Sequence, residues 1–199
     1  MRLRRVFVAA ALALLIAGTG QAVVINEFYY GTEPPGDNEW VELYNKSGFD
    51  IDLTNWQIAV ANNGPFAIIH TITAGDPGTT ITTQDFFLVA DAVPATATVT
   101  GANLNLGRDT GTVVYGIALL DDTGTTVDTV LYAPAGASNT YLLEDDTGST
   151  ALTRVKLVGG DESYYRFQNQ DTDDSSADFF GSGGPGTPVP VDVRRFILE

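Results

Sequence analysis

The chain has 199 residues, with 25 acidic and 10 basic residues, one histidine and no cysteine. This length fits a single domain. The absence of cysteine excludes disulfides, thiolate metal sites and cysteine nucleophiles. The net charge of −15 disfavours nucleic-acid partners, because an acidic surface repels the phosphate backbone. The same charge favours the binding of divalent cations and of partners with a basic surface.

The first 22 residues have the pattern of a secretory signal peptide. A basic start, Met1–Arg5, precedes an apolar run over 6–17 and a small, polar stretch that ends at Ala22. The apolar run is shorter than the ~20 residues that span a bilayer, although a retained N-terminal anchor is the alternative. Cleavage after Ala22 leaves 7 basic and 25 acidic residues, a charge of −18. We therefore expect an exported protein without a membrane span, and export without disulfides suits a bacterial extracellular protein.

Three strands are predicted between residues 23 and 58, in the stretch VVINEFYYGTEPPGDNEWVELYNKSGFDIDLTNWQI. Turn-forming residues at 31–36 and 45–48 separate the apolar runs. Alternation in the first run places Ile25 and Glu27 on one face, opposite Phe28. In the second run, Val41 and Leu43 lie opposite Trp40, Glu42 and Tyr44.

Further strand patterns continue along the chain, and residues 91–108 have little periodicity and predict a long connection. The expected strands are 65–72, 79–83, 86–90, 112–120, 126–132, 150–157 and 163–167. The run 86–90 is continuously apolar and predicts a strand that is covered on both faces. A hairpin joins 112–120 to 126–132, with Gly124 available for a positive φ. No helical periodicity occurs after the signal, so the pattern predicts an all-β sandwich with Trp40, Trp56, Phe86 and Phe87 in its core.

Several segments in this order resemble the lamin-tail domain family. They are INEF, EWVELYN and IDLTNWQI in the opening stretch, FFLVAD at 86–91, VDTVLY at 127–132, SYYRF at 163–167 and DTDDSSADF at 171–179. The resemblance implies an immunoglobulin-like β-sandwich over residues 23–180, followed by a Gly/Pro-rich segment and tail over 181–199. The tail from 191 is an edge strand or a disordered end. The family has no common catalytic residues and, in bacteria, occurs in secreted and surface proteins.

One acidic loop is a candidate metal site. Asp171, Asp173, Asp174 and Asp178 lie within eight residues, and calcium prefers such oxygen ligands. The loop lacks the glycine and the closing glutamate of an EF-hand. A solvated loop whose aspartates cap local backbone amides is the alternative, and charge runs usually have that role.

The candidates for catalysis are few. Glu27 and Glu42, on neighbouring strands, are a conceivable acid–base pair of a glycan hydrolase. Asp-Thr-Gly occurs at 109–111, 122–124 and 146–148, where a turn is favoured over an aspartic-protease motif. His70 lacks the serine context of a triad. Asn45-Lys46-Ser47 fits an N-glycosylation acceptor.

These observations predict a secreted, non-catalytic module for adhesion, structure or protein binding, with no cofactor. A calcium-dependent carbohydrate or protein binder is the alternative, and a hydrolase is the third hypothesis. The partner is a protein or a cell-surface glycan, and nucleic acid is excluded on charge.

Overall fold

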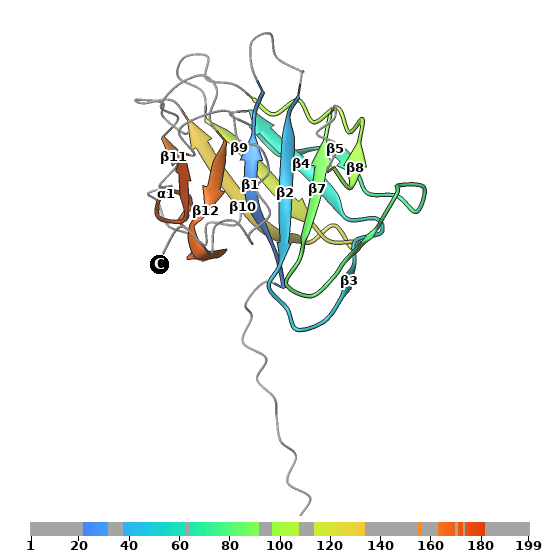
Figure 1. The fold of residues 1–199 in the computed structure, drawn as a ribbon. Helices are drawn as coiled ribbons and strands as arrows, with labels where there is room; N and C mark the ends of the chain where they lie inside the picture. The colour runs from blue at the N-terminus through green and yellow to red at the C-terminus, as the bar shows by residue number, and fades with distance from the viewer. Residues whose placement is uncertain are drawn as a thin grey trace, which may run out of the picture.

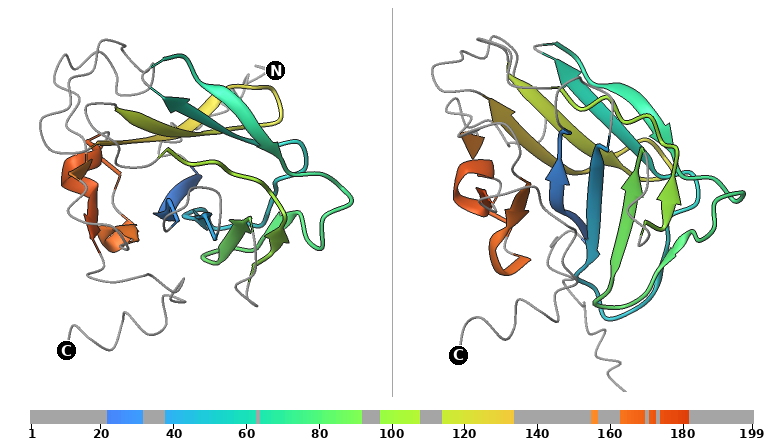
Figure 2. Two further views of the ribbon diagram at one scale, coloured as in Figure 1. Left: turned by 90° about the horizontal axis from the view of Figure 1, so that it is seen from above. Right: turned by 45° about the horizontal axis from the view of Figure 1, so that its top comes forward.

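Two β-sheets packed face to face form the domain (Figures 1 and 2). The computed structural model describes residues 22–31, 38–62, 64–91, 97–107, 114–133, 155–156, 163–169, 171–172 and 174–181. The larger sheet has the strand order β13-β12-β1-β2-β7-β8, and the second has the order β11-β10-β9-β4-β5. Strands β3 and β6 form a separate pair. This architecture confirms the predicted all-β, immunoglobulin-like sandwich.

The strands follow the predicted runs closely. The larger sheet contains β1 (Val23–Tyr29), β2 (Trp40–Asn45), β7 (Phe86–Ala90), β8 (Val99–Thr100), β12 (Tyr164–Arg166) and β13 (Phe179–Gly181). The second sheet contains β4 (Gln57–Asn62), β5 (Ala67–Thr71), β9 (Tyr115–Leu120), β10 (Thr126–Ala133) and β11 (Val155–Lys156), and the separate pair is β3 (Ile51–Asp52) with β6 (Thr80–Ile81). A 3₁₀ turn, η1 (Phe167–Asn169), and one helical turn, α1 (Ser175–Asp178), precede β13. None of the described helices is long and apolar enough to cross a membrane.

Neighbouring strands are antiparallel except for β7 with β8 and β10 with β11. The hairpin between β9 and β10 has Gly124 at φ +81°, as predicted. Of the three Asp-Thr-Gly copies, the one at 122–124 lies in this turn, and the copies at 109–111 and 146–148 lie outside the described residues. Asp121 accepts hydrogen bonds from the backbone amides of Thr123 and Thr125 there.

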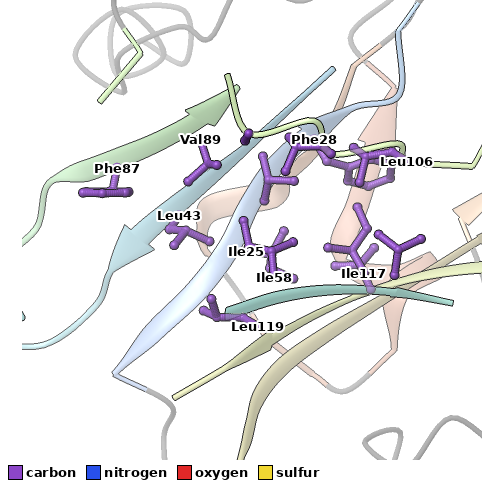
Figure 3. Close-up of a cluster of buried hydrophobic side chains, with 14 of the residues drawn as sticks. Ile25, Phe28, Leu43, Ile58, Phe87, Val89, Leu106, Ile117 and Leu119 are labelled. Atoms are coloured by element: carbon purple, nitrogen blue, oxygen red, sulfur yellow. The ribbon is translucent and has the colours of Figure 1, made fainter. Parts of the chain in front are cut away.

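The main core lies between the two sheets (Figure 3). Ile25, Phe28 and Leu43 enter it from the larger sheet, and Ile58 and Ile117 enter it from the second sheet. Each is removed from water, and burial of such a side chain stabilises the fold by roughly 1.5–3 kcal/mol.

The predicted aromatic core residues divide between two clusters. Phe87 lies in the main core, and Trp56 packs against it while partly buried. Trp40 instead packs with Tyr29, Leu88 and Ala90 on the other side of the larger sheet. Phe86 is also on that side, with its ring 4.8 Å from the ring of Tyr44. Strand β7 is thus covered on both faces as predicted, apart from the partly exposed Phe86.

Strict alternation fails in β1. The pairing of β1 with β2 shifts register between Ile25 and Glu27, so Ile25 and Phe28 both reach the main core. Such a shift is a β-bulge, in which one extra residue reverses the order of faces that follows it. The prediction that Ile25 and Glu27 share a face, opposite Phe28, is therefore wrong.

The stretch predicted as a long connection, 91–108, contributes to the core. After the short β8, Ala102, Leu104 and Leu106 are buried in the main cluster. Asn103 and Asn105 between them have φ of 51° and 46°. Asp91 and Glu39 accept hydrogen bonds from the amides of Leu104 and Leu106. This segment thus packs against the core without forming a regular strand. The amides of Leu104 and Leu106 donate to side-chain carboxylates and not to the backbone carbonyls of a neighbouring strand.

Gly107 ends this segment in a space that admits no side chain. A Cβ at this position would lie 1.8 Å from Cδ1 of the Tyr115 ring, and that ring is buried and stacked 5.6 Å from the ring of Tyr132. We expect Gly107→Ala to destabilise the fold by about 2 kcal/mol through overpacking. Urea unfolding measures this loss. Gly48→Ala is the control, because no atom lies within 4 Å of its Cβ, and equal losses in the two variants would contradict the packing described.

Candidate functional site

The most concentrated group of charges in the described residues surrounds Arg166, at the end of β12. Its Nη2 atom donates to both carboxylate oxygens of Asp128 on β10, at 3.0 and 2.7 Å. Its Nη1 atom donates to Asp171 and Asp178, each at 3.0 Å. Such bidentate, charge-assisted contacts fix geometry more strongly than neutral hydrogen bonds do. We call these four residues the Arg166 cluster.

The Arg166 cluster also fixes β1. Nε of Arg166 donates to the carbonyl of Ile25 at 2.9 Å, and the Ile25 amide donates to Asp128 at 2.6 Å. The guanidinium lies 4.7 Å from the centre of the Phe179 ring. A single side chain therefore joins β1, β10, β12 and the segment that leads into β13.

Acidic groups outnumber the cation in this cluster. Both Arg166 and Asp128 are almost completely buried. Burial raises the pKa of Asp128 to about 7; Arg166 opposes this rise, whereas Asp171 adds to it by repulsion. The cluster thus has the features of a structural ion network.

The candidate calcium ligands take separate roles. Asp171 and Asp178 bind Arg166, and Asp178 also accepts from the amide and hydroxyl of Thr172. Asp174 accepts from the Ala177 amide at the start of α1, which is the capping role considered as the alternative. Asp173 lies outside the described residues. Among those described, no group of three or more acidic or histidine side chains is arranged to hold a metal, and calcium binding stays a prediction.

Glu27 and Glu42 are directly opposite each other in the register of β1 and β2. Both are buried. Glu27 accepts from the Ser163 hydroxyl at 2.6 Å, and Glu42 accepts from the Asn26 amide at 2.7 Å. The sequence thus correctly placed the two acids together. Their hydrogen-bonded burial in the sheet is unlike the open, aromatic-lined cleft that a glycan hydrolase requires.

Asn45, the proposed glycosylation acceptor, is completely buried. Its amide nitrogen donates to the carbonyls of Phe49, Ile81 and Thr82 at 2.8–3.1 Å. Its amide oxygen accepts from the backbone and hydroxyl of Ser47. The acceptor prediction is therefore wrong for this folded chain, because the nitrogen that would carry the sugar has three internal partners.

The turn that Asn45 fixes exposes Phe49. This ring is 65% exposed, more than any other large apolar side chain in the described residues. The Phe49 backbone is held by Asn45 and by the Ser47 hydroxyl, which donates to its carbonyl at 2.8 Å. An aromatic ring is thus exposed on a rigid turn, an arrangement that suits a contact with a partner.

His70 on the edge strand β5 is half-buried. Desolvation lowers its pKa below 6.5, and the charges of Asp76 and Asp91 oppose this shift. A lowered folded-state pKa means that the unfolded chain binds the proton first, so stability falls as the pH drops below about 6.5. We expect His70→Gln to remove this part of the pH dependence. Tm measured from pH 7.5 to 5 in both proteins tests it, and parallel curves would contradict the assignment.

Comparison with known proteins supports the fold. The Lamin Tail Domain model matches residues 17–134, and no match was found among curated proteins. Two structures from Sulfolobus acidocaldarius are similar. The archaellum periplasmic stator protein complex FlaF and FlaG is 12% identical with a TM-score of 0.38, over 56% of this chain and 88% of that chain. The archaellum periplasmic stator protein FlaG is 13% identical with a TM-score of 0.36, over 55% and 97%.

The similarity to the stator proteins is too limited to assign their role to this chain. The family match covers more than half of the residues, from the end of the predicted signal through β10. The resemblance noted beyond residue 134 lies outside that match. The strands within the family match form most of the two sheets described above. The chain therefore belongs to the Lamin Tail Domain family.

Proposed function

We propose that this protein is an exported, non-catalytic module that binds a protein partner outside the cell or at its surface. The observation that carries the proposal is Phe49, an exposed ring on a turn whose backbone is fixed by Asn45 and Ser47. Aromatic side chains dominate binding energy at protein interfaces, and a rigid turn lowers the entropy lost on binding. The family match supports a structural or binding role.

Several polar groups that suggested chemistry have structural contacts. Glu27 and Glu42 bind Ser163 and Asn26 within the sheet, and two of the loop aspartates, Asp171 and Asp178, bind Arg166. We therefore favour a protein partner over turnover of a glycan. The net charge of −15 favours a partner with a basic surface around the apolar contact.

Site-specific photo-crosslinking in the producing cells tests the proposal. A photoreactive phenylalanine analogue at position 49 is compared with the same analogue at 68, where Ile68 is also exposed but lies on β5. We expect a defined protein adduct from position 49 in the exported fraction and none from 68. No adduct from position 49, or an adduct equally strong from 68, would contradict the role of Phe49.

We expect calcium to leave the protein unchanged. Arg166 already binds two of the four candidate ligands, Asp171 and Asp178, so a cation would have to compete with these buried ion pairs. Tm with millimolar calcium and with a chelator should agree within error, and calorimetry should detect no binding heat. A saturable heat with a higher Tm would favour the calcium-dependent binder instead.

A further inference from the structure

A pair of phenylalanine rings is exposed at the edge of the larger sheet, where β12 and β13 meet. Phe167 is 40% exposed and Phe180 is 47% exposed, and their ring centres lie 5.7 Å apart in an edge-to-face arrangement. We call these two rings the aromatic pair. The fold therefore leaves apolar surface exposed at this edge of the sheet as well as at the 45–49 turn.

The position of the aromatic pair follows from the buried residues beside it. Arg166 and Phe179 are register partners on β12 and β13, both are buried, and the guanidinium lies over the Phe179 ring. Because successive side chains of a strand point to opposite faces, the residues that follow these two, Phe167 and Phe180, point away from the core. The Arg166 cluster therefore fixes the backbone that presents the aromatic pair.

The backbone directly after Phe167 is strained. Gln168 and Asn169 have φ of 51° and 55°, in the left-handed region that residues other than glycine rarely adopt. Strained backbone persists only where the surrounding contacts fix it, and such positions are concentrated at functional sites. The turn that follows β12 thus holds Phe167 beside Phe180 at a conformational cost, an arrangement that suits a contact with a partner.

The aromatic pair and the 45–49 turn lie at the same end of the larger sheet. Val23, at the start of β1, is opposite Asn45, and β12 runs antiparallel to β1, so that β12 ends near the start of β1. Strands β12, β1 and β2 lie side by side in Figure 1. Lys46 contacts Asp171, in the segment after β12, at 3.6 Å. Because β2 and β13 are three strand spacings apart, or about 15 Å, one partner is able to reach both places.

Phe49 alone provides too little surface for a specific interface. An aromatic side chain buries about 150–250 Å², whereas a standard interface buries about 800 Å² on each partner. A partner that covers the 45–49 turn and the aromatic pair together gains the surface of two further rings and of the chain between them. The area required therefore favours one extended contact over an isolated one.

Carboxylates predominate at this end of the sheet. The aspartates that are exposed or partly exposed there are Asp50, Asp52, Asp85 and Asp171. The two described basic side chains nearby, Lys46 and Arg166, are both paired with aspartates. This end of the sheet thus has an excess of negative charge, which is complementary to a basic partner.

We propose, on the basis of the function proposed above, that the aromatic pair is a second contact for the protein that binds Phe49, and that this partner places an arginine over the pair. A guanidinium stacks on aromatic rings and pairs with carboxylates, and arginine is enriched among the residues that dominate interfaces. Arg166 makes the same kind of contact within this chain, 4.7 Å from the centre of the Phe179 ring. A second copy of this chain, with its net charge of −15, lacks the complementary charge.

Photo-crosslinking from position 180 in the producing cells tests the second contact. We expect a photoreactive phenylalanine analogue at 180 to give an adduct with the same protein as position 49. Mass spectrometry of the adduct should find arginine beside the crosslinked residue of that protein. Position 68, on β5, is the control and should give no adduct.

The outcomes at positions 49 and 180 separate this inference from the proposed function. If position 49 reacts but position 180 gives no adduct, an adduct with a different protein or an adduct with a second copy of this chain, the second contact is overturned and the proposed function stands. If neither position reacts, both are overturned.

Removal of one ring of the aromatic pair gives a second measurement. In a chain labelled at position 49, Phe180→Ala should reduce the adduct by about tenfold, the scale of a dominant aromatic contact. Ile68→Ala, which also truncates an exposed apolar side chain, should leave the adduct unchanged. Tm of both variants is measured so that the yields are compared where the domain is folded. An undiminished adduct in the Phe180 variant would overturn the second contact.

The charge of the partner is tested with purified chain, labelled at position 180 and added to the exported fraction of the producing cells. The adduct should fall several-fold between about 50 and about 500 mM sodium chloride, because salt screens exposed charges. Asp50→Asn with Asp52→Asn should lower the yield at low salt and flatten the salt dependence. Asp121→Asn with Asp122→Asn, in the hairpin of the second sheet, is the control of equal charge. A yield independent of salt, or equal effects of the two double variants, would overturn the assignment of a basic partner.

Discussion

Arg166→Met is expected to lower the free energy of unfolding by about 3–5 kcal/mol, because it removes the cation from a buried group of carboxylates. Asp128 and Asp178 are buried, and both lose a partner within 3.0 Å. The contact with the Ile25 carbonyl is lost as well. For a domain of this size, a change of 1 kcal/mol corresponds to about 2–4 °C in Tm, so a fall of about 10 °C is expected in thermal unfolding.

Two further variants identify the cause of this loss. Lys46 also contacts Asp171, at 3.6 Å, but it is partly exposed. Lys46→Met should therefore cost less than about 1 kcal/mol. Adding Asp128→Asn to Arg166→Met should recover part of the loss by removing an uncompensated charge. Equal losses for Lys46→Met and Arg166→Met would contradict the network described.

Asn45→Ala is expected to cost about 3 kcal/mol, because a buried residue with several hydrogen bonds is replaced by one that makes none. The carbonyls of Phe49, Ile81 and Thr82 lose their donor, and the 45–49 turn loses its attachment to β6. Urea unfolding measures the cost. Asn62→Ala, at the exposed end of β4, should stay within about 0.5 kcal/mol.

The Asn45 variant also links the turn to the proposed function. Because Asn45 fixes the backbone of Phe49, the substitution should weaken crosslinking from position 49 at temperatures where the domain remains folded. Undiminished crosslinking in the folded variant would contradict the idea that rigidity of the turn contributes to binding.

The sequence predicted the strands because the two sheets bury one face of each strand and leave turn-forming residues between them. Alternation correctly placed Val41 and Leu43 in the core and Trp40 opposite. It failed at Asn26, where a bulge changes the faces of the residues that follow. A bulge is set by pairing with the neighbouring strand, so the local pattern of β1 did not reveal it.

Long-range contacts limited the prediction of the site. The loop aspartates were correctly singled out as a charged group, but their partner, Arg166, also binds Asp128, which is 38 residues away. The buried role of 101–107 was missed for the same reason, since Leu106 is fixed by Glu39 at a separation of 67 residues. The one available signal for the Arg166 cluster was Arg166 itself, in the strand-like segment SYYRF, because it is the one basic residue between Lys156 and Arg194 in a stretch rich in aspartate.

Photo-crosslinking from position 49 in the producing cells is the most direct test of the central claim, that this chain is an exported module that binds a protein through an exposed ring. The account predicts one defined protein adduct in the exported fraction. An excess of unlabelled wild-type chain should compete with the labelled chain and reduce this adduct, whereas an excess of the unlabelled Phe49→Ala chain should not. Absence of any adduct from position 49, or an adduct that both competitors displace equally, would contradict it.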